Sequence, residues 1–333
     1  MLQSYRHFGI SGTLLAGVLM LQGCATAERH VTPDVRTFEA PDAITDRQAG
    51  SNETLRVMTL NLAHGRGEAF HQLLQNTDTT LRNLEKVSAL LQREQPDVVA
   101  LQEADGPSYW SGNFHHVDYL AEQAAYSHAV NGLHVDGLGL AYGTALLSDL
   151  SLTRAQAVTF NPDLAMTPKG FVVSTVDWPG QANIQIDVVS LHLDFSSAET
   201  RRLQAQELID FMRDRRRPMI VMGDFNAEWS EENTAVQLIA DNLGLSAYRP
   251  QAEGQGTFAY NGKRLDWVLI SAGLEFREYQ VMSDAVSDHR GVIAELGLTN
   301  KLVRNDYATQ YCLTARFAPL PWWRNGIAGS TAL

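Results

Sequence analysis

The chain has 333 residues, of which 44% are hydrophobic and 19% charged, and its 26 Lys and Arg residues oppose 38 Asp and Glu residues. This composition excludes a disordered chain, a collagen-like repeat and a disulfide scaffold, because it offers enough apolar residues for a core and only two cysteines. The formal net charge of −12 disfavours a protein that binds nucleic acid without sequence preference, although it leaves room for a local basic cleft.

The amino-terminal segment has a short basic start, an apolar run and a cysteine. Arg6 and His7 precede an apolar stretch over residues 8–21, and LQGC ends at Cys24. The stretch is shorter than the roughly 20 residues that a spanning helix needs. The segment resembles a bacterial lipoprotein signal, which implies cleavage after residue 23 and lipid on Cys24. The alternatives are an ordinary signal peptide and a membrane helix. We expect a protein of the bacterial cell envelope, anchored on the periplasmic face of the outer membrane.

The residues after Cys24 are polar and show no sustained helical or strand period. Pro33 and Pro41 interrupt the segment. We therefore expect residues 24–52 to be the lipidated cysteine and a flexible linker that holds a globular body away from the lipid surface.

From Leu55 onward, buried strands alternate with helices. The apolar patterns predict strands at 55–62, 97–103, 142–148, 171–178, 184–194, 218–225, 265–271, 277–282 and 291–298. They predict helices at 79–95, 115–126, 198–214 and 233–242, and a glycine-rich stretch around Gly132, Gly137 and Gly139 leads into the strand at 142–148. This alternation indicates α/β layers with one buried sheet or a pair of sheets, in a single domain over 53–298.

Residues 299–333 form a carboxy-terminal extension of unknown role. The segment contains Trp322, Trp323 and Arg324. These side chains suit either a membrane interface or packing back on the body, and we favour the packing.

Polar residues collect where the apolar strands end, a pattern that hydrophobic packing alone has no reason to produce. They are Asn61, Glu103, His192, Asp224 with Asn226, and Asp288 with His289, while Asp266 begins a further strand. Carboxylates near buried strands need a cation or hydrogen-bond donors. A divalent metal meets this need, and hard oxygen ligands select Mg²⁺, Mn²⁺ or Ca²⁺ over Zn²⁺.

Six short motifs follow one another in a fixed order. They are TLN, LQE, SLHLD, GDFN, LDWVLIS and SDH, and they lie within the region of resemblance, roughly residues 54–298. The ordered set resembles the endonuclease/exonuclease/phosphatase superfamily, which includes DNase I-like nucleases. The resemblance implies a four-layer α/β/β/α sandwich, with two mostly antiparallel sheets flanked by helices, and metal-dependent phosphoester hydrolysis. The strand and helix pattern alone leaves a parallel α/β fold open.

The same resemblance implies a metal centre. Glu103 corresponds to the main ligand, with Asn61 beside it and Asp288 contributing. The expected ion is Mg²⁺, with Mn²⁺ or Ca²⁺ as alternatives.

The resemblance also assigns catalytic roles. Asp224 corresponds to the residue that aligns or deprotonates the attacking water, and Asn226 to one that orients the phosphate or the nucleophile. His192 and His289 would donate hydrogen bonds to the phosphoryl oxygens, and Asp266 would hold the imidazole of His289. A carboxylate partner fixes the tautomer of a histidine, which makes this pairing chemically sensible.

Two basic residues are weaker substrate-binding candidates. Arg66, in HGRG, has the reach to contact a phosphate group, and a solvated loop arginine is the alternative. Lys169 precedes the strand at 171–178, where relatives often have a basic residue lining the cleft.

These features together predict an envelope-anchored, Mg²⁺-dependent phosphodiesterase or phosphatase. The acidic body and the lipid anchor favour a small phosphoester or a phospholipid headgroup as substrate, because no stretch rich in Lys and Arg with interleaved aromatic residues occurs. The alternatives are an envelope-associated nuclease and a catalytically silent binding lipoprotein. The sequence points to no protein partner.

Overall fold

The computed structural model of this chain describes residues 28–39, 53–69, 71, 75–162, 165, 167–229 and 234–303. The predictions for the signal peptide, for Cys24 and for residues 304–333 therefore lie outside the described residues. Within the described ranges, no helix combines the length and the apolar character needed to cross a membrane.

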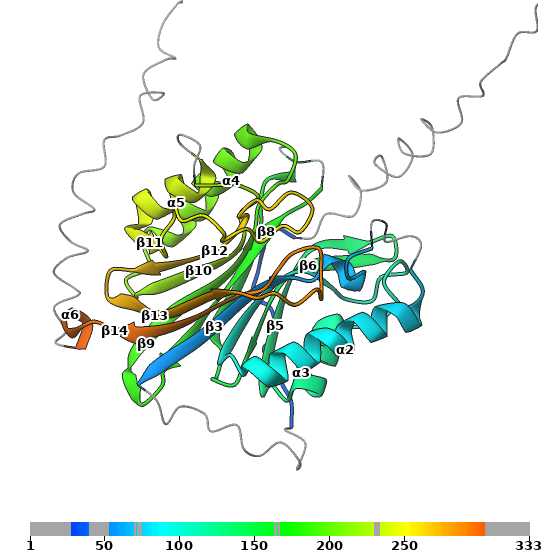
Figure 1. Cartoon of the computed structure of the whole chain (residues 1–333), viewed down its shortest axis with the longest axis horizontal. Helices are drawn as coiled ribbons and strands as arrows, with labels where there is room; N and C mark the ends of the chain where they lie inside the picture. Colours follow the sequence, from blue (N-terminus) through cyan, green and yellow to red (C-terminus); the bar gives the residue numbers. More distant parts are fainter. Residues whose placement is uncertain are drawn as a thin grey trace, which may run out of the picture.

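Two seven-stranded sheets pack face to face (Figure 1). The first sheet runs in the order β1 (His30–Val31), β7 (Thr153–Thr159), β8 (Gly170–Trp178), β9 (Gln181–His192), β10 (Met219–Asp224), β12 (Asp266–Ser271) and β11 (Leu245–Ala247). The second runs in the order β13 (Leu274–Val281), β14 (Val292–Leu298), β3 (Thr54–Asn61), β4 (Val98–Asp105), β6 (Leu140–Ser148), β5 (His128–Gly137) and β2 (Arg36–Thr37). The β9–β10 and β3–β4 pairs are parallel, whereas the other strand pairs of these sheets are antiparallel.

Helices cover the outer face of each sheet, as Figure 1 shows. The second sheet is covered by α2 (Thr77–Glu94) and α3 (His116–Ala124), and the first by α4 (Ala198–Met212) and α5 (Ala235–Leu243). The predicted four-layer α/β/β/α sandwich is therefore confirmed.

The helix boundaries follow from local chemistry. Asn76 caps the start of α2 by accepting a hydrogen bond from the backbone of Thr79, and the helix ends at Gln95 in a left-handed conformation, directly before Pro96. Thr234 starts α5 with a reciprocal capping box, and Gly244, at a φ of 64°, ends it.

Three apolar cores join the four layers. One lies between the sheets and includes Val57, Val172 and Met222, none of which has exposed surface. The other two lie between each sheet and its helices. Burying each such side chain stabilises the fold by about 1.5–3 kcal/mol relative to exposing it.

The glycine-rich stretch before residue 142 is a strand, β5, although no strand was predicted there. A side chain at Gly132 would bring its Cβ to 3.0 Å from the Cβ of Ala157 and 3.2 Å from that of Val172 in the other sheet. Glycine at this position permits the close approach of the two sheets. The glycine that suggested an irregular segment is therefore a packing requirement.

Part of the predicted linker also belongs to the fold. Within residues 28–39, β1 pairs with β7 and β2 pairs with β5, so this segment adds an edge strand to each sheet. The prediction of a flexible linker is wrong for these residues, because backbone pairing with an existing sheet edge needs no apolar period in the added strand. At the other end, α6 (Asn300–Val303) places Leu302 in the core between the sheets.

Candidate active site

The strand register brings the polar residues of the motifs together. Because β9 and β10 are parallel, Asp224 pairs directly with His192, and on the other side of β10 it pairs with Asp266. In the second sheet, the parallel β3–β4 pair sets Asn61 beside Gln102, next to Glu103. Residues separated by more than 200 positions in the chain therefore meet at one end of the sandwich.

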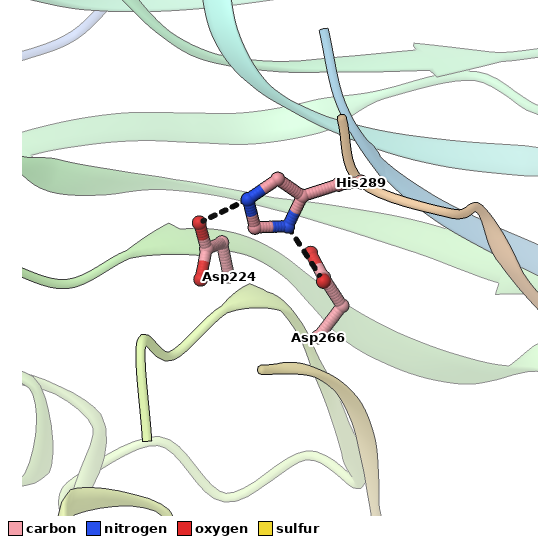
Figure 2. A group of neighbouring side chains, drawn as sticks. All are labelled: Asp224, Asp266 and His289. Carbon is pink, nitrogen blue, oxygen red and sulfur yellow. Dashed lines mark hydrogen bonds and ion pairs between the residues drawn. The ribbon is translucent and has the colours of Figure 1, made fainter. Parts of the chain in front are cut away.

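The first group is Asp224, His289 and Asp266 (Figure 2). Nδ1 of His289 donates to Oδ2 of Asp266 at 2.8 Å, and Nε2 lies 3.8 Å from Oδ2 of Asp224. One ligand atom from each of the three residues lies within 4.8 Å of the others, so this buried group could hold a metal ion.

The ionisation of this group is unusual. Burial alone would lower the pKa of His289, but the charges of Asp266 and Asp224 outweigh it and raise the pKa to about 10. Burial, together with the neighbouring charge of Asp266, raises the pKa of Asp224 to about 7, against the opposing effect of His289. The imidazole is thus cationic at neutral pH, beside a carboxylate poised to exchange a proton.

Further hydrogen bonds fix Asp224 in place. The Asn61 side-chain amide donates to its Oδ2 at 3.0 Å, and the backbone N–H of Asn226 donates to its Oδ1 at 2.9 Å. The side-chain amide of Asn226 donates to the backbone oxygen of Leu193 at 3.0 Å. Asn226 has a φ of 49°, a left-handed conformation that asparagine tolerates better than most residues. Its observed contacts hold the loop after β10 against the end of β9.

The second group surrounds Glu103. Its carboxylate lies 3.7 Å from Nζ of Lys169 and 3.3 Å from Nε2 of His64, and it accepts a hydrogen bond from Arg66 at 3.4 Å. Although burial raises the pKa of Glu103, the charges of His64, Lys169 and Arg66 hold it well below its usual value. Glu103 is therefore ionised at neutral pH.

A β-bulge aims Glu103 into the site. The register between β4 and β6 shifts between Gln102 and Ala104, and Glu103 between them has a φ of 49°. Side chains along a regular strand alternate between the two faces of the sheet. A bulge interrupts this alternation and so changes the direction of the side chain of the bulged residue. Such a conformation costs about 1–3 kcal/mol and typically persists at functional sites.

Arg66 links two of the predicted metal ligands. Its Nη1 donates to Glu103, and its Nη2 donates to Oδ2 of Asp288 at 2.5 Å. Oδ1 of Asp288 also accepts a hydrogen bond from Ser287 at 3.3 Å. One guanidinium thus occupies the space between the two carboxylates.

Lys169 and His192 connect the two groups. Nζ of Lys169 lies 3.4 Å from Nδ1 of His192, whose Nε2 lies 3.5 Å from Oδ2 of Asp224. Burial, followed by the charge of Lys169, lowers the pKa of His192 well below its usual value, so this imidazole is neutral. An ammonium can only donate, so Nδ1 accepts and the proton of His192 is on Nε2.

Sequence reasoning missed a second imidazole held between two acids. Nδ1 of His64 donates to Oδ1 of Asp105 at 2.6 Å, while its Nε2 faces Glu103. Trp110 donates to the other oxygen of Asp105 at 2.9 Å, and the ring of Tyr142 lies edge-on to His64. The signal was available: His64 stands two residues before Arg66, and Asp105 two residues after Glu103.

All ten residues predicted for the active site thus lie in one connected network. They are Asn61, Arg66, Glu103, Lys169, His192, Asp224, Asn226, Asp266, Asp288 and His289. The geometry tests their proximity, while their chemical roles stay predictions.

The chain has two packed sheets between helices, and buried acids, amides and imidazoles gather at the strand ends. This combination defines a protein of the DNase I-like hydrolase fold. The family model described as "Endonuclease/Exonuclease/phosphatase family" matches residues 58–289, and the chain belongs to this family.

Solved structures share this fold. An endonuclease/exonuclease/phosphatase from Beutenbergia cavernae DSM 12333 has a TM-score of 0.60 and 21% identity, with 74% of this chain and 72% of that chain covered. A mannosyl-6-phosphatase from Bacteroides thetaiotaomicron VPI-5482 has a TM-score of 0.53 and 16% identity, with 73% and 99% covered. At these identities the likeness shows the fold alone.

A curated relative covers a shorter stretch. A UPF0294 protein of Vibrio cholerae serotype O1 (strain ATCC 39315 / El Tor Inaba N16961) is 34% identical over 121 residues, or 35% of this chain. The match spans 41% of that relative's length.

Proposed function

We propose that this protein is a metal-dependent phosphoester hydrolase, acting as a phosphodiesterase or a phosphatase. One observation carries the proposal: Glu103, which cations surround, and the buried Asp224, whose pKa is raised to about 7, are connected through Lys169 and His192 in a single site. Two carboxylates whose pKa values are pushed apart are the usual arrangement for dividing charge stabilisation from proton transfer.

We assign the metal ion to Glu103, Asp288 and Asn61. Glu103 and Asp288 supply hard carboxylate oxygens. Both carboxylates pair with the positively charged Arg66, so their surroundings already favour a cation. Mg²⁺ suits these ligands, with Mn²⁺ or Ca²⁺ as alternatives. When bound, the ion supplies Lewis-acid stabilisation of phosphoryl oxygens. Arg66 must then release at least one carboxylate, which frees it to pair with a phosphate group.

The Asp224–Asp266–His289 group is the other candidate for the ion. Oδ1 of Asp266 is buried and has no hydrogen-bond partner in the described part of the chain, which favours this alternative. Against it, Nδ1 of His289 is engaged by Asp266, and the raised pKa of His289 keeps both ring nitrogens protonated. A protonated nitrogen has no lone pair for a metal.

The remaining residues handle the water and the developing charge. Asp224, with a pKa of about 7, suits the general base that takes a proton from the attacking water. The cationic His289 and the Nε2–H of His192 suit donors to the phosphoryl oxygens, where charge increases in the transition state. Asp266 keeps the imidazole of His289 oriented and protonated.

The substrate we favour is a small phosphoester or a phospholipid headgroup. The net charge of −12 works against long nucleic acids, and one structure of the same fold is a mannosyl-6-phosphatase. The alternative within the family is an envelope-associated nuclease, which requires strongly salt-dependent cleavage. A catalytically silent binding lipoprotein is the alternative from another class.

The envelope anchor rests on the amino-terminal sequence. We propose that Cys24 is lipidated and tethers the protein to the outer membrane on its periplasmic side. Labelling with a fatty-acid probe is expected in the wild type and absent in Cys24→Ser. Label that persists in the variant contradicts the proposal.

A substrate panel tests the hydrolase assignment. Purified protein is assayed with Mg²⁺ and Mn²⁺ on sugar phosphates, phospholipids, plasmid DNA and RNA, with and without a chelator. We expect chelator-sensitive hydrolysis of small phosphoesters that Glu103→Ala and His289→Ala abolish. Degradation of plasmid or RNA alone favours the nuclease, and inactivity on every substrate favours the binding lipoprotein.

A further inference from the structure

Arginines gather around a surface hollow at the other end of the first sheet. The hollow has a volume of about 680 Å³ and is lined by Thr32, Arg154, Ala155, Gln156 and residues 214–217, of which the last three are arginines. Arg215, Arg216 and Arg217 lie just before β10, with Pro218 between them and the strand, whereas Asp224 of the active site ends that strand. Five strand positions correspond to roughly 17 Å, so the hollow is separate from the catalytic groups.

The buried carboxylate of Asp187 holds two of these arginines in place. Nε of Arg215 donates to Oδ2 of Asp187 at 2.8 Å, and its Nη1 donates to Gln156 at 2.7 Å. Nη1 of Arg217 lies 3.8 Å from the other oxygen of Asp187, a carboxylate without exposed surface. These guanidinium groups are therefore oriented before any ligand arrives, which reduces the entropy lost on binding.

Backbone geometry directs Arg154 to the same place. The register between β7 and β8 shifts between Thr153 and Gln156, and Arg154 within this bulge has a φ of 51°. Such a conformation is uncommon for a residue other than glycine, and a bulge changes the direction of its side chain. The exposed Arg154 donates to Gln185 and lines the hollow.

The local charge is opposite to that of the whole protein. Four arginines and one acid, Asp214, line the hollow of a chain whose net charge is −12. Arg216 is exposed and, within the described residues, makes no ion pair or side-chain hydrogen bond. Its charge is therefore available to a ligand, unlike that of Arg202, which pairs with Glu199 on the surface of α4.

We propose that this hollow is a second, non-catalytic site that binds a phosphate-bearing anion. The planar, forked guanidinium group matches the geometry of phosphate oxygens, and several of them around one hollow suit a single phosphate or phosphodiester group. The group can belong to free phosphate or to the headgroup of an anionic lipid. The site does not depend on the proposed hydrolase activity.

Paired variants of the full-length protein test the site. Arg154→Gln with Arg216→Gln removes two charges while keeping the two arginines that pair with Asp187, and Arg202→Gln is the matched control. In calorimetric titration with inorganic phosphate, the double variant is expected to lose a binding event that the control retains, or to weaken it about tenfold. Its hydrolysis of the phosphoester panel and its melting temperature are expected to equal those of the control.

Vesicles separate the two sources of phosphate. Flotation with phosphatidylcholine vesicles, with and without 30% phosphatidylglycerol, compares the same three proteins. A preference for phosphatidylglycerol that the double variant loses supports the site with a lipid headgroup as ligand. Phosphate binding lost in the double variant without any vesicle preference supports the site with a soluble phosphate. Equal binding of phosphate and of both vesicle types by the double variant and the control overturns the proposal.

Discussion

The two halves of the active site use the same arrangement with opposite results. In each, a buried acid holds an imidazole that faces a second carboxylate: Asp105 and His64 face Glu103, while Asp266 and His289 face Asp224. The pKa of Glu103 is held well below its usual value, whereas the pKa of Asp224 is raised to about 7.

The neighbouring charges explain the difference. Burial raises the pKa of both carboxylates, so burial alone cannot separate them. Arg66 and Lys169 add positive charge around Glu103, whereas the charge of Asp266 reaches Asp224. The balance of surrounding charges therefore makes one carboxylate a permanent anion and the other a proton acceptor.

The largest expected effect follows from removing the proton acceptor. Asp224→Asn is expected to lower kcat by a factor of about 10³, because general-base catalysis typically contributes between about 10² and 10⁴. The assay is steady-state hydrolysis of the best substrate from the panel. Asp210→Asn, on the exposed surface of α4, is the control and is expected to keep full activity. A kcat for Asp224→Asn within threefold of the control contradicts the assignment.

The next prediction concerns how Asp266 keeps His289 protonated. Asp266→Asn removes the acid that contributes most to keeping His289 protonated, so the pKa of His289 is expected to fall from about 10 towards neutrality. We expect kcat to fall by about 10² at pH 7.5, since the donor loses part of its charge and its orientation. NMR titration of the histidines measures the pKa. A pKa of His289 that stays near 10 shows that Asp266 does not control it.

A smaller effect concerns the cation beside Glu103. Arg66 lies between two proposed metal ligands, so its charge opposes an incoming divalent ion. Arg66→Gln is expected to tighten Mn²⁺ binding about tenfold, measured by calorimetry, and to raise KM if the arginine also contacts phosphate. Weaker Mn²⁺ binding in the variant means that Arg66 supports the metal site rather than competing with it.

A third buried imidazole shows what happens without a carboxylate partner. His134 contacts the hydroxyl groups of Thr144 and Thr159, and burial, followed by the charge of Lys169, lowers its pKa to about 3. The unfolded chain, with a pKa near 6.5, then binds a proton that the folded protein excludes. The resulting stability is complete above pH 6.5 and is lost progressively as the pH falls towards 3.

This contribution amounts to about 2 kcal/mol between pH 7.5 and pH 5. His134→Gln is therefore expected to unfold more easily at pH 7.5 but to lose about 2 kcal/mol less than the wild type over that interval. Urea denaturation at the two pH values measures the difference. An equal loss in both proteins contradicts a buried, neutral His134.

The sequence predicted those parts of the fold that depend on local pattern. The strand ends carrying Asn61, Glu103, His192 and Asp224 were found, because apolar strands ending in polar residues are visible along the chain. The strand β5 was missed because the glycine that allows the sheets to approach also suggests an irregular segment. The strands β1 and β2 were missed because edge pairing leaves no apolar period.

Within the site, prediction reached the residues but not their contacts. Asn226 was expected to orient the phosphate or the nucleophile, and its side-chain amide donates to the backbone of Leu193. His64 and Asp105 stand close to predicted site residues, but their pairing joins separate elements, so the sequence did not show that they meet. The division of charge between Glu103 and Asp224 depends on which cations surround each of them, which only the three-dimensional arrangement reveals.

Calorimetric titration of Mn²⁺ into Glu103→Gln and Asp266→Asn tests this division most directly. We expect Glu103→Gln to weaken binding at least about a hundredfold and Asp266→Asn to bind within about threefold of the wild type. The reverse result, with binding kept in Glu103→Gln and lost in Asp266→Asn, would move the ion to the Asp224–Asp266–His289 group and contradict the roles assigned to the two carboxylates.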